Sequence, residues 1–97
     1  MKRKDIEIIA DTCLEFTQKV CDLQDVIKKD ELLKRLKGIT RNYTIESDDT
    51  ISVDFKSMLF TFHKTTLNGD YWELCGNASY YTFDADGCWL DTYDVEL

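Results

Sequence analysis

The first third of the chain has the hydrophobic spacing of an amphipathic helix. Apolar residues follow one another at steps of three and four, so they share one stripe of a helix. They are Ile6, Ile9, Cys13, Phe16, Val20, Leu23 and Ile27. We therefore predict a helix over about residues 4–27, with this stripe buried against a sheet. The alternative is a coiled-coil seam, but Asp30 at the next seam position makes it short, and Cys13 and Phe16 are poor zipper residues.

A second, shorter helix is predicted after Asp30, whose carboxylate can cap its N-terminus. Gly38 is typical of a helix end, and basic residues just before it suit the negative end of the helix dipole. The apolar side consists of Leu32, Leu33 and Leu36, and the basic residues are Lys34, Arg35 and Lys37. The positive charge of this half is therefore expected mostly on a solvated helix face.

From Ile39 onward the apolar residues alternate with polar ones, which predicts β-strands. The chain has no proline, and polar or glycine-containing turns separate the apolar runs. The expected strands are residues 39–45, 51–55, 58–62, 70–75, 79–84 and 88–97. Short turns favour an antiparallel meander. The predicted class is α+β in a single domain of residues 1–97: helices in 1–38, packed on an antiparallel sheet of four to six strands in 39–97.

The last predicted hairpin has a two-residue turn, Asp86 and Gly87, which sets the pairing of its strands. One face then holds the pairs Tyr80–Tyr93, Thr82–Asp91 and Asp84–Trp89, and the other holds Tyr81–Thr92, Phe83–Leu90 and Ala85–Cys88. We predict that the second face packs on the core and that the first is exposed.

The turn expected at Asn68 and Gly69 does not separate the large residues onto one face of the sheet. A two-residue loop there pairs Phe62 with Cys75 and puts large residues on both faces. We expect a longer loop or a bulge at this turn, and the register stays open.

Charge is sorted along the chain. Residues 1–41 carry ten Lys/Arg and eight Asp/Glu, whereas residues 42–97 carry two and eleven, so the net charges of +2 and −9 make the total of −7. Lys64 is the last basic residue, and seven acids and seven aromatic residues follow it. Such sorting affects the choice of partner and the association rate more than the fold.

Length and composition limit the function classes. A chain of 97 residues with 43% hydrophobic residues can bury one core without metal or disulfide support. Acids in the first helix interrupt any signal peptide, and no apolar run reaches the roughly 18 residues of a membrane helix. We therefore expect a cytoplasmic protein whose four cysteines are free thiols.

No motif indicates catalysis, a metal or a cofactor. His63 is the only histidine and has no nucleophile at a recognisable spacing, and no two cysteines have a Cys-x-x-Cys spacing. The segment from Asp84 to Gly87 resembles the start of a calcium loop, but the glutamate required at its twelfth position is absent. We expect no enzyme and no cofactor; a small Asp/Glu-based enzyme is the weaker alternative.

Acids beside aromatic residues are typical of a surface that contacts a basic partner. A plain alternative is a soluble sheet whose edges are guarded by charge, but such surfaces usually mix both signs. Basic surfaces are mostly built for nucleic acid, so we expect inhibition of a nucleic-acid-handling protein by mimicry, with no direct binding of nucleic acid and no membrane. The expected partner-binding residues are Glu73, Tyr80, Asp84, Asp86, Trp89, Asp91 and Tyr93.

In size, acidity and lack of catalytic motifs, the whole chain is similar in character to two kinds of small inhibitor. These are phage-encoded anti-defence proteins, anti-CRISPR proteins among them, and immunity proteins that neutralise nuclease toxins. The likeness implies a monomer or small homo-oligomer with a basic protein partner. The alternative from another class is an accessory or oligomerising subunit that uses the stripe of the first helix.

Overall fold

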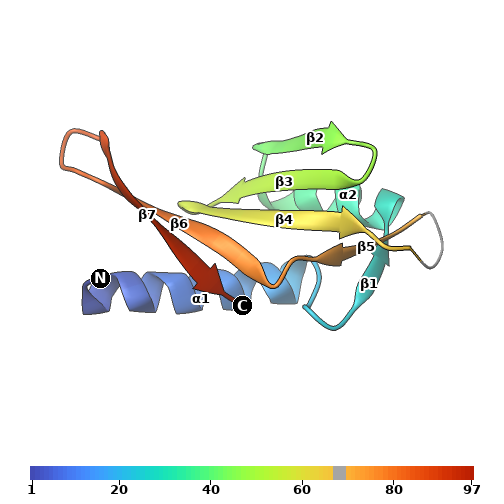
Figure 1. Ribbon diagram of the computed structural model, residues 1–97, viewed down its shortest axis with the longest axis horizontal. Helices are drawn as coiled ribbons and strands as arrows, with labels where there is room; N and C mark the ends of the chain where they lie inside the picture. Colours follow the sequence, from blue (N-terminus) through green and yellow to red (C-terminus); the bar gives the residue numbers. More distant parts are fainter. Residues whose placement is uncertain (67–69) are drawn as a thin grey trace.

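Residues 1–66 and 70–97, which the computed structural model describes, form two helices and seven strands (Figure 1). In chain order they are α1 (Arg3–Lys19), β1 (Val26–Lys28), α2 (Lys29–Ile39), β2 (Tyr43–Ser47), β3 (Thr50–Phe55), β4 (Met58–Lys64), β5 (Tyr71–Leu74), β6 (Asn77–Phe83) and β7 (Trp89–Glu96).

The strands form one antiparallel sheet in which β4 is central. One side of β4 pairs with β3, which pairs with β2. The other side is shared, because β5 pairs with Phe62, His63 and Lys64 while β6 pairs with Met58 and Leu59. Beyond these, β1 pairs with β5 and β7 pairs with β6. The predicted α+β class is confirmed, with seven strands in place of four to six.

Both helices pack on the same face of this sheet, which we call the helix face. Four helix-side residues are fully buried in one core with the strands: Phe16 of α1, Val20 at the C-cap of α1, and Leu32 and Leu36 of α2. Phe16 stacks on Phe60 with 3.9 Å between ring centroids. The strand residues in the core alternate along each strand: Ile51, Val53, Phe55, Met58, Phe60, Phe62, Trp72, Leu74, Ala78 and Tyr80. The alternate residues between them form the open face, which neither of the two described helices covers.

The first helix is shorter than the sequence predicts, because α1 ends at Lys19. Arg35 donates a hydrogen bond of 2.7 Å to the Val20 carbonyl just past the helix end. Ile27 is buried as predicted, but in β1, where it pairs with Trp72. At the other end Ile6 is exposed, whereas Ile8 and Ile9 pack partly against the core.

The start and end of the second helix also differ from the prediction. The helix begins at Lys29 and ends at Ile39, with Lys28 rather than Asp30 at the N-cap. β1 leads directly into α2, so Asp30 lies inside the first turn, where its charge still suits the helix dipole. The first strand of the second half begins at Tyr43, later than the predicted Ile39.

The register of the last hairpin is confirmed for its inner pairs, namely Tyr80–Tyr93, Tyr81–Thr92 and Thr82–Asp91. Nearer the turn the register shifts, and Phe83 pairs with Trp89 instead of Leu90. The predicted assignment of the two faces is wrong, because Tyr80 lies on the helix face with 4% of its surface exposed. Tyr80 pairs with buried Met58 and therefore belongs to the face of β4 that packs on the helices.

The turn predicted at Asn68 and Gly69 lies outside the described residues. The strands that flank it pair Phe62 with Leu74, which differs from the Phe62–Cys75 pair of a two-residue loop. The expected departure from that register is therefore confirmed.

Candidate functional site

The end of the β6–β7 hairpin projects from the body of the protein (Figure 1). β4 begins at Met58, opposite Tyr80, and the Tyr81 amide donates a hydrogen bond of 2.9 Å to the Ser57 carbonyl. Farther out, residues 82–91 form a ribbon in which β6 and β7 pair only with each other. The projection contributes to an elongated molecule of 44 × 22 × 22 Å.

The turn at the end of this ribbon is organised by Asp84. Its Oδ1 accepts hydrogen bonds of 2.9 Å from the backbone amides of both Asp86 and Cys88. The Gly87 amide donates to the Asp84 carbonyl, and Gly87 adopts a φ of 81°, which glycine tolerates without strain. The turn spans residues 84–88 and is longer than the predicted two-residue loop. Asp84 thus has a structural task, whereas the exposed Asp86 carboxylate accepts no hydrogen bond from residues 1–66 or 70–97.

Three large apolar side chains are exposed around the turn. Phe83 is 51% exposed, Trp89 60% and Leu90 53%, and we call these three residues the tip cluster. The indole Nε1 of Trp89 donates a hydrogen bond of 3.0 Å to the Thr92 hydroxyl, which fixes the ring beside β7. Exposed apolar side chains that gather at one place, rather than singly, are typical of a contact surface.

The structure brings four of the predicted site residues together on the ribbon. Asp84, Asp86, Trp89 and Asp91 are all exposed there. Three other predicted residues lie elsewhere: Glu73 is exposed on β5, opposite His63 and Val26, Tyr93 is half-buried against the core, and Tyr80 is buried. The prediction that both tyrosines belong to the exposed face is therefore wrong.

Tyr80 instead joins β6 to α1. Its hydroxyl donates a hydrogen bond of 2.9 Å to Asp5 Oδ1, and the other carboxylate oxygen accepts one from the Lys2 amide. Burial raises the pKa of Tyr80, and the hydrogen bond and negative charge of Asp5 raise it further.

The sequence reasoning missed Phe83 and Leu90, which it placed in the core. A signal for Phe83 was present, because Asn77 and Ser79 occupy the same face of β6. Polar residues at alternate positions of a strand mark its solvent side, so they indicate that Phe83 faces solvent as well.

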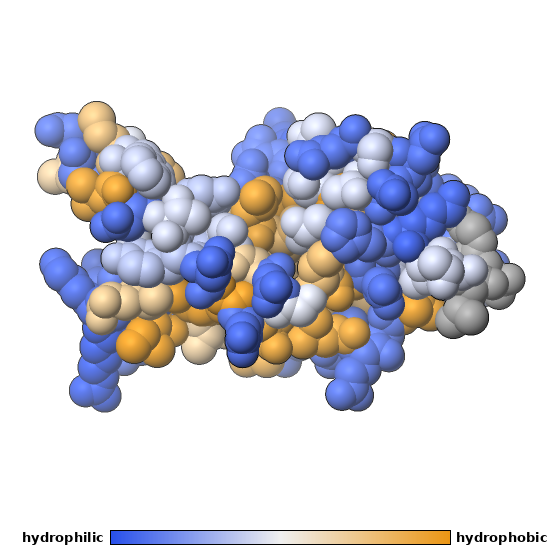
Figure 2. All heavy atoms as spheres, viewed as in Figure 1, coloured by the Kyte–Doolittle hydropathy of each residue, from blue (hydrophilic) through white to orange (hydrophobic). Residues whose placement is uncertain are grey.

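A groove separates the ribbon from the first turns of α1 and encloses about 730 Å³. Figure 2 shows it as the recess at the left, between the hairpin and the start of the chain. Lys2 and Lys4 line it from the helix side and Asp91 and Tyr93 from the hairpin side. Its lining therefore carries both signs of charge, unlike the tip.

In the described structure, the acids that form ion pairs all lie in the first half of the chain. Across residues 1–66 and 70–97, the four ion pairs use Glu7, Glu15 and Glu31 as their acids. Lys56 and Lys19 lower the pKa of Glu15, which contacts both, mainly through the hydrogen bond from Lys56. The acids of residues 42–97 form no such pair in the described structure, so their negative charge is not neutralised within the chain.

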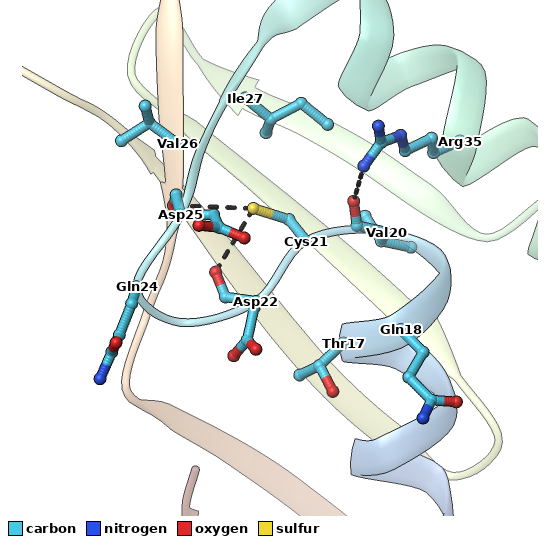
Figure 3. A pocket seen from close by; sticks show the side chains of 10 residues that line it. All are labelled: Thr17, Gln18, Val20, Cys21, Asp22, Gln24, Asp25, Val26, Ile27 and Arg35. Atoms are coloured by element: carbon cyan, nitrogen blue, oxygen red, sulfur yellow. Dashed lines mark hydrogen bonds between the residues drawn. The ribbon is translucent and has the colours of Figure 1, made fainter.

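A second hollow lies where α1 connects to β1 (Figure 3). The Cys21 thiol donates to the carbonyls of Asp22 and Asp25, at 3.4 and 3.7 Å. Burial and the nearby Asp25 carboxylate raise the pKa of Cys21. A thiol with a raised pKa forms little of the reactive thiolate, so Cys21 acts here as a structural residue.

Polar residues surround His63 at the edge of β3 and β4. Ser47 and Thr50 both donate hydrogen bonds to Asp49, and these bonds lower its pKa. Among residues 1–66 and 70–97, the one hydrogen bond of the His63 ring is between Nδ1 and the Thr50 hydroxyl, at 3.5 Å, so no carboxylate of these residues is hydrogen-bonded to the imidazole. Within the described part of the chain, no three His, Cys, Asp or Glu side chains are grouped so that they could hold a metal ion.

Comparison with known proteins gives no relative. No family model matches the chain, and no curated protein or solved structure is significantly similar to it. Neither helix in the described residues has the length and apolar character needed to cross a membrane.

Proposed function

We propose that this protein is a small cytoplasmic binding protein that inhibits a basic, nucleic-acid-handling protein by covering its nucleic-acid-binding surface. The observation that carries the proposal is the ribbon of residues 82–91. It presents the tip cluster beside Asp86 and Asp91, whose charges have no ion-pair partner among the described residues. We propose the tip cluster as the anchor of the interface.

The two kinds of side chain have different tasks in this interface. Aromatic side chains that enter a pocket on the partner dominate affinity in most protein interfaces. Carboxylates facing a basic surface mainly raise the association rate, and salt weakens their effect. Trp89→Ala should therefore speed dissociation, whereas Asp86→Asn combined with Asp91→Asn should slow association, most strongly at low salt.

The partner class follows from charge. Residues 42–97 have a net charge of −9, which repels phosphates and attracts the Lys/Arg-rich surfaces that hold nucleic acid. An acidic ribbon can occupy such a surface in place of nucleic acid. Anti-defence proteins such as anti-CRISPR proteins and immunity proteins of nuclease toxins act on partners of this kind, and both remain candidates.

The alternative of an oligomerising subunit has less support. The stripe of the first helix supplies Phe16 and Val20 to the protein's own core, so these residues are not available to a second copy. Of that stripe, Ile6 is exposed, and Leu14 is a second exposed apolar residue of the same helix.

Pull-down from nuclease-treated lysate, with tagged wild type and Trp89→Ala, tests the proposal. Wild type should retain a basic protein that added single-stranded or double-stranded nucleic acid displaces, and Trp89→Ala should retain much less of it. Leu14→Ala is the matched control, because Leu14 is an exposed apolar residue on α1, far from the tip in sequence. Equal retention by wild type and Trp89→Ala, or no displacement by nucleic acid, would contradict the proposal.

A further inference from the structure

The described sheet has three strands with a free edge, and β7 is the longest of them. β1 has three residues, and β2 has five with a register shift between Ile45 and Ser47. β7 has eight residues and pairs only with β6. Free edges that are long invite another strand to pair, which proteins usually prevent by short edges, bulges, proline or charged side chains, lysine above all. β7 contains neither lysine nor proline, and its register shift lies at its start.

The ladder between β6 and β7 defines which backbone groups point outward. The Leu97 amide donates to the Gly76 carbonyl at 2.8 Å, so these two residues are a hydrogen-bonded pair. Such pairs alternate along an antiparallel ladder, which makes Tyr93 and Val95 hydrogen-bonded to β6. The backbone N–H and C=O groups of Thr92, Asp94 and Glu96 therefore point away from β6, along the free edge.

The side chains on this edge differ between the two faces. Tyr93 and Val95 lie on the helix face and pack partly against the core. Asp94 and Glu96 lie on the open face and are exposed, as is Thr92. In a strand added at this edge, every second side chain would lie next to the carboxylates of β7 on the open face. The side chains between them would lie next to the apolar groups of β7 on the helix face.

This charge pattern selects the occupant. Pairing β7 with β7 of a second copy would bring Asp94 and Glu96 close to their own counterparts, and like charges across a ladder are destabilising. Lys or Arg at the same positions would form favourable cross-strand pairs. The acids thus discourage self-association and favour a basic strand.

We propose that the free edge of β7 binds an extended basic segment of the partner protein as an additional β-strand. Backbone hydrogen bonds to Thr92, Asp94 and Glu96 hold the segment, and its basic side chains alternate along the open face. This inference takes the basic charge of the partner from the proposed function. It adds that the bound element is an extended segment and that it binds by strand addition.

A synthetic peptide tests this inference without knowledge of the partner. The probe is a blocked ten-residue peptide that alternates Arg and Val, titrated to about 1 mM, and the control peptide has Glu in place of Arg. Amide hydrogen exchange, followed residue by residue by NMR, is the readout. The amides of Thr92, Asp94 and Glu96 should exchange at least tenfold more slowly in the presence of the Arg peptide. The Glu peptide should leave their exchange rates unchanged.

Two variants separate backbone pairing from charge. Asp94→Pro removes one outward N–H without touching the ladder to β6, a position where an edge strand tolerates proline. It should weaken peptide binding at least tenfold, whereas Asp94→Asn should weaken it less and reduce its salt dependence. If Asp94→Pro does not fold, as judged by its thermal melt, the exchange experiment on wild type decides alone.

No binding of the Arg peptide, or protection that omits these three amides, would overturn the inference. Full binding by folded Asp94→Pro, or a wild-type dimer in solution that Asp94→Pro dissociates, would overturn it as well. A different result is that the pull-down fails but the Arg peptide still protects the three amides. That result would reject the tip cluster as the anchor of the interface and would still support strand addition at β7.

Discussion

The packing of α1 on the sheet rests on Phe16, and its replacement by alanine is the sharpest test of the fold. The ring is fully buried and stacks on Phe60 at 3.9 Å, with Phe55 and Phe62 each at 5.9 Å between centroids. Burying a phenylalanine contributes about 1.5–3 kcal/mol, and a well-placed aromatic pair adds about 0.5–1.5 kcal/mol. With the cavity that remains, Phe16→Ala should lower the free energy of unfolding by about 3–5 kcal/mol.

Such a loss is large for a domain of this size. A free energy of unfolding of about 5–15 kcal/mol is typical, and each kcal/mol shifts the melting temperature by roughly 4–8 °C in a chain of about 100 residues. Urea unfolding followed by fluorescence measures the loss, because Trp72 is buried in the same core and becomes exposed on unfolding.

Leu14→Ala is the control for this experiment. Leu14 lies on the same helix but is exposed, so its truncation should change stability by less than about 0.5 kcal/mol. A loss below about 1 kcal/mol for Phe16→Ala, or an equal loss for both variants, would show that α1 does not pack on the sheet through Phe16.

Three further predictions concern a turn, a hydrogen bond and the thiols. Ser57 has a φ of 66°, a strained value for any residue but glycine, so Ser57→Gly should raise stability by up to about 1 kcal/mol in urea unfolding. The pKa of Tyr80 is raised in the folded state, so protonated Tyr80 contributes to the free energy of unfolding. This contribution is complete below the ordinary pKa of tyrosine and is lost as the pH rises through the raised pKa. Melting temperature should therefore fall more steeply above about pH 10 for wild type than for Tyr80→Phe, and equal slopes would contradict the raised pKa. Alkylation without reductant should label the exposed Cys88 first in the native protein and all four cysteines after denaturation, as mass spectrometry can measure.

The spacing of apolar residues predicted the class of the fold, because buried positions in helices and strands are apolar at regular intervals along the sequence. The alternation of Ile51, Val53 and Phe55 located β3, and the helical spacing around Phe16 located α1. The same signal could not show where α1 ends, because Ile27 continues the spacing although it belongs to β1. Its position depends on a pairing with Trp72, a residue distant in the chain, and no local pattern contains that information.

The placement of the candidate site residues was predicted in part for a similar reason. Charge and turn residues placed Asp84, Asp86, Trp89 and Asp91 at the last hairpin, and the structure brings them together there. The face of the hairpin was not decided locally, because both of its faces carry aromatic residues. The neighbouring strand decides it, since Tyr80 must lie beside Met58. The free edge of β7 likewise depends on the order of strands in the sheet, which the sequence does not state.

The acids on β7 have a simpler explanation, namely that charge protects a free edge from aggregation. The sign of the charge distinguishes this explanation from the binding of a basic strand. Protection needs charge of either sign, because lysine guards edges as well as acids do. Binding of a basic partner needs negative charge. Replacing Asp94 and Glu96 by lysine should therefore leave a monomer of similar stability, as shown by light scattering and urea unfolding, and abolish binding of the Arg peptide. If the doubly substituted protein still binds that peptide, the carboxylates serve only as guards of the edge and the partner is not selected by its charge at β7.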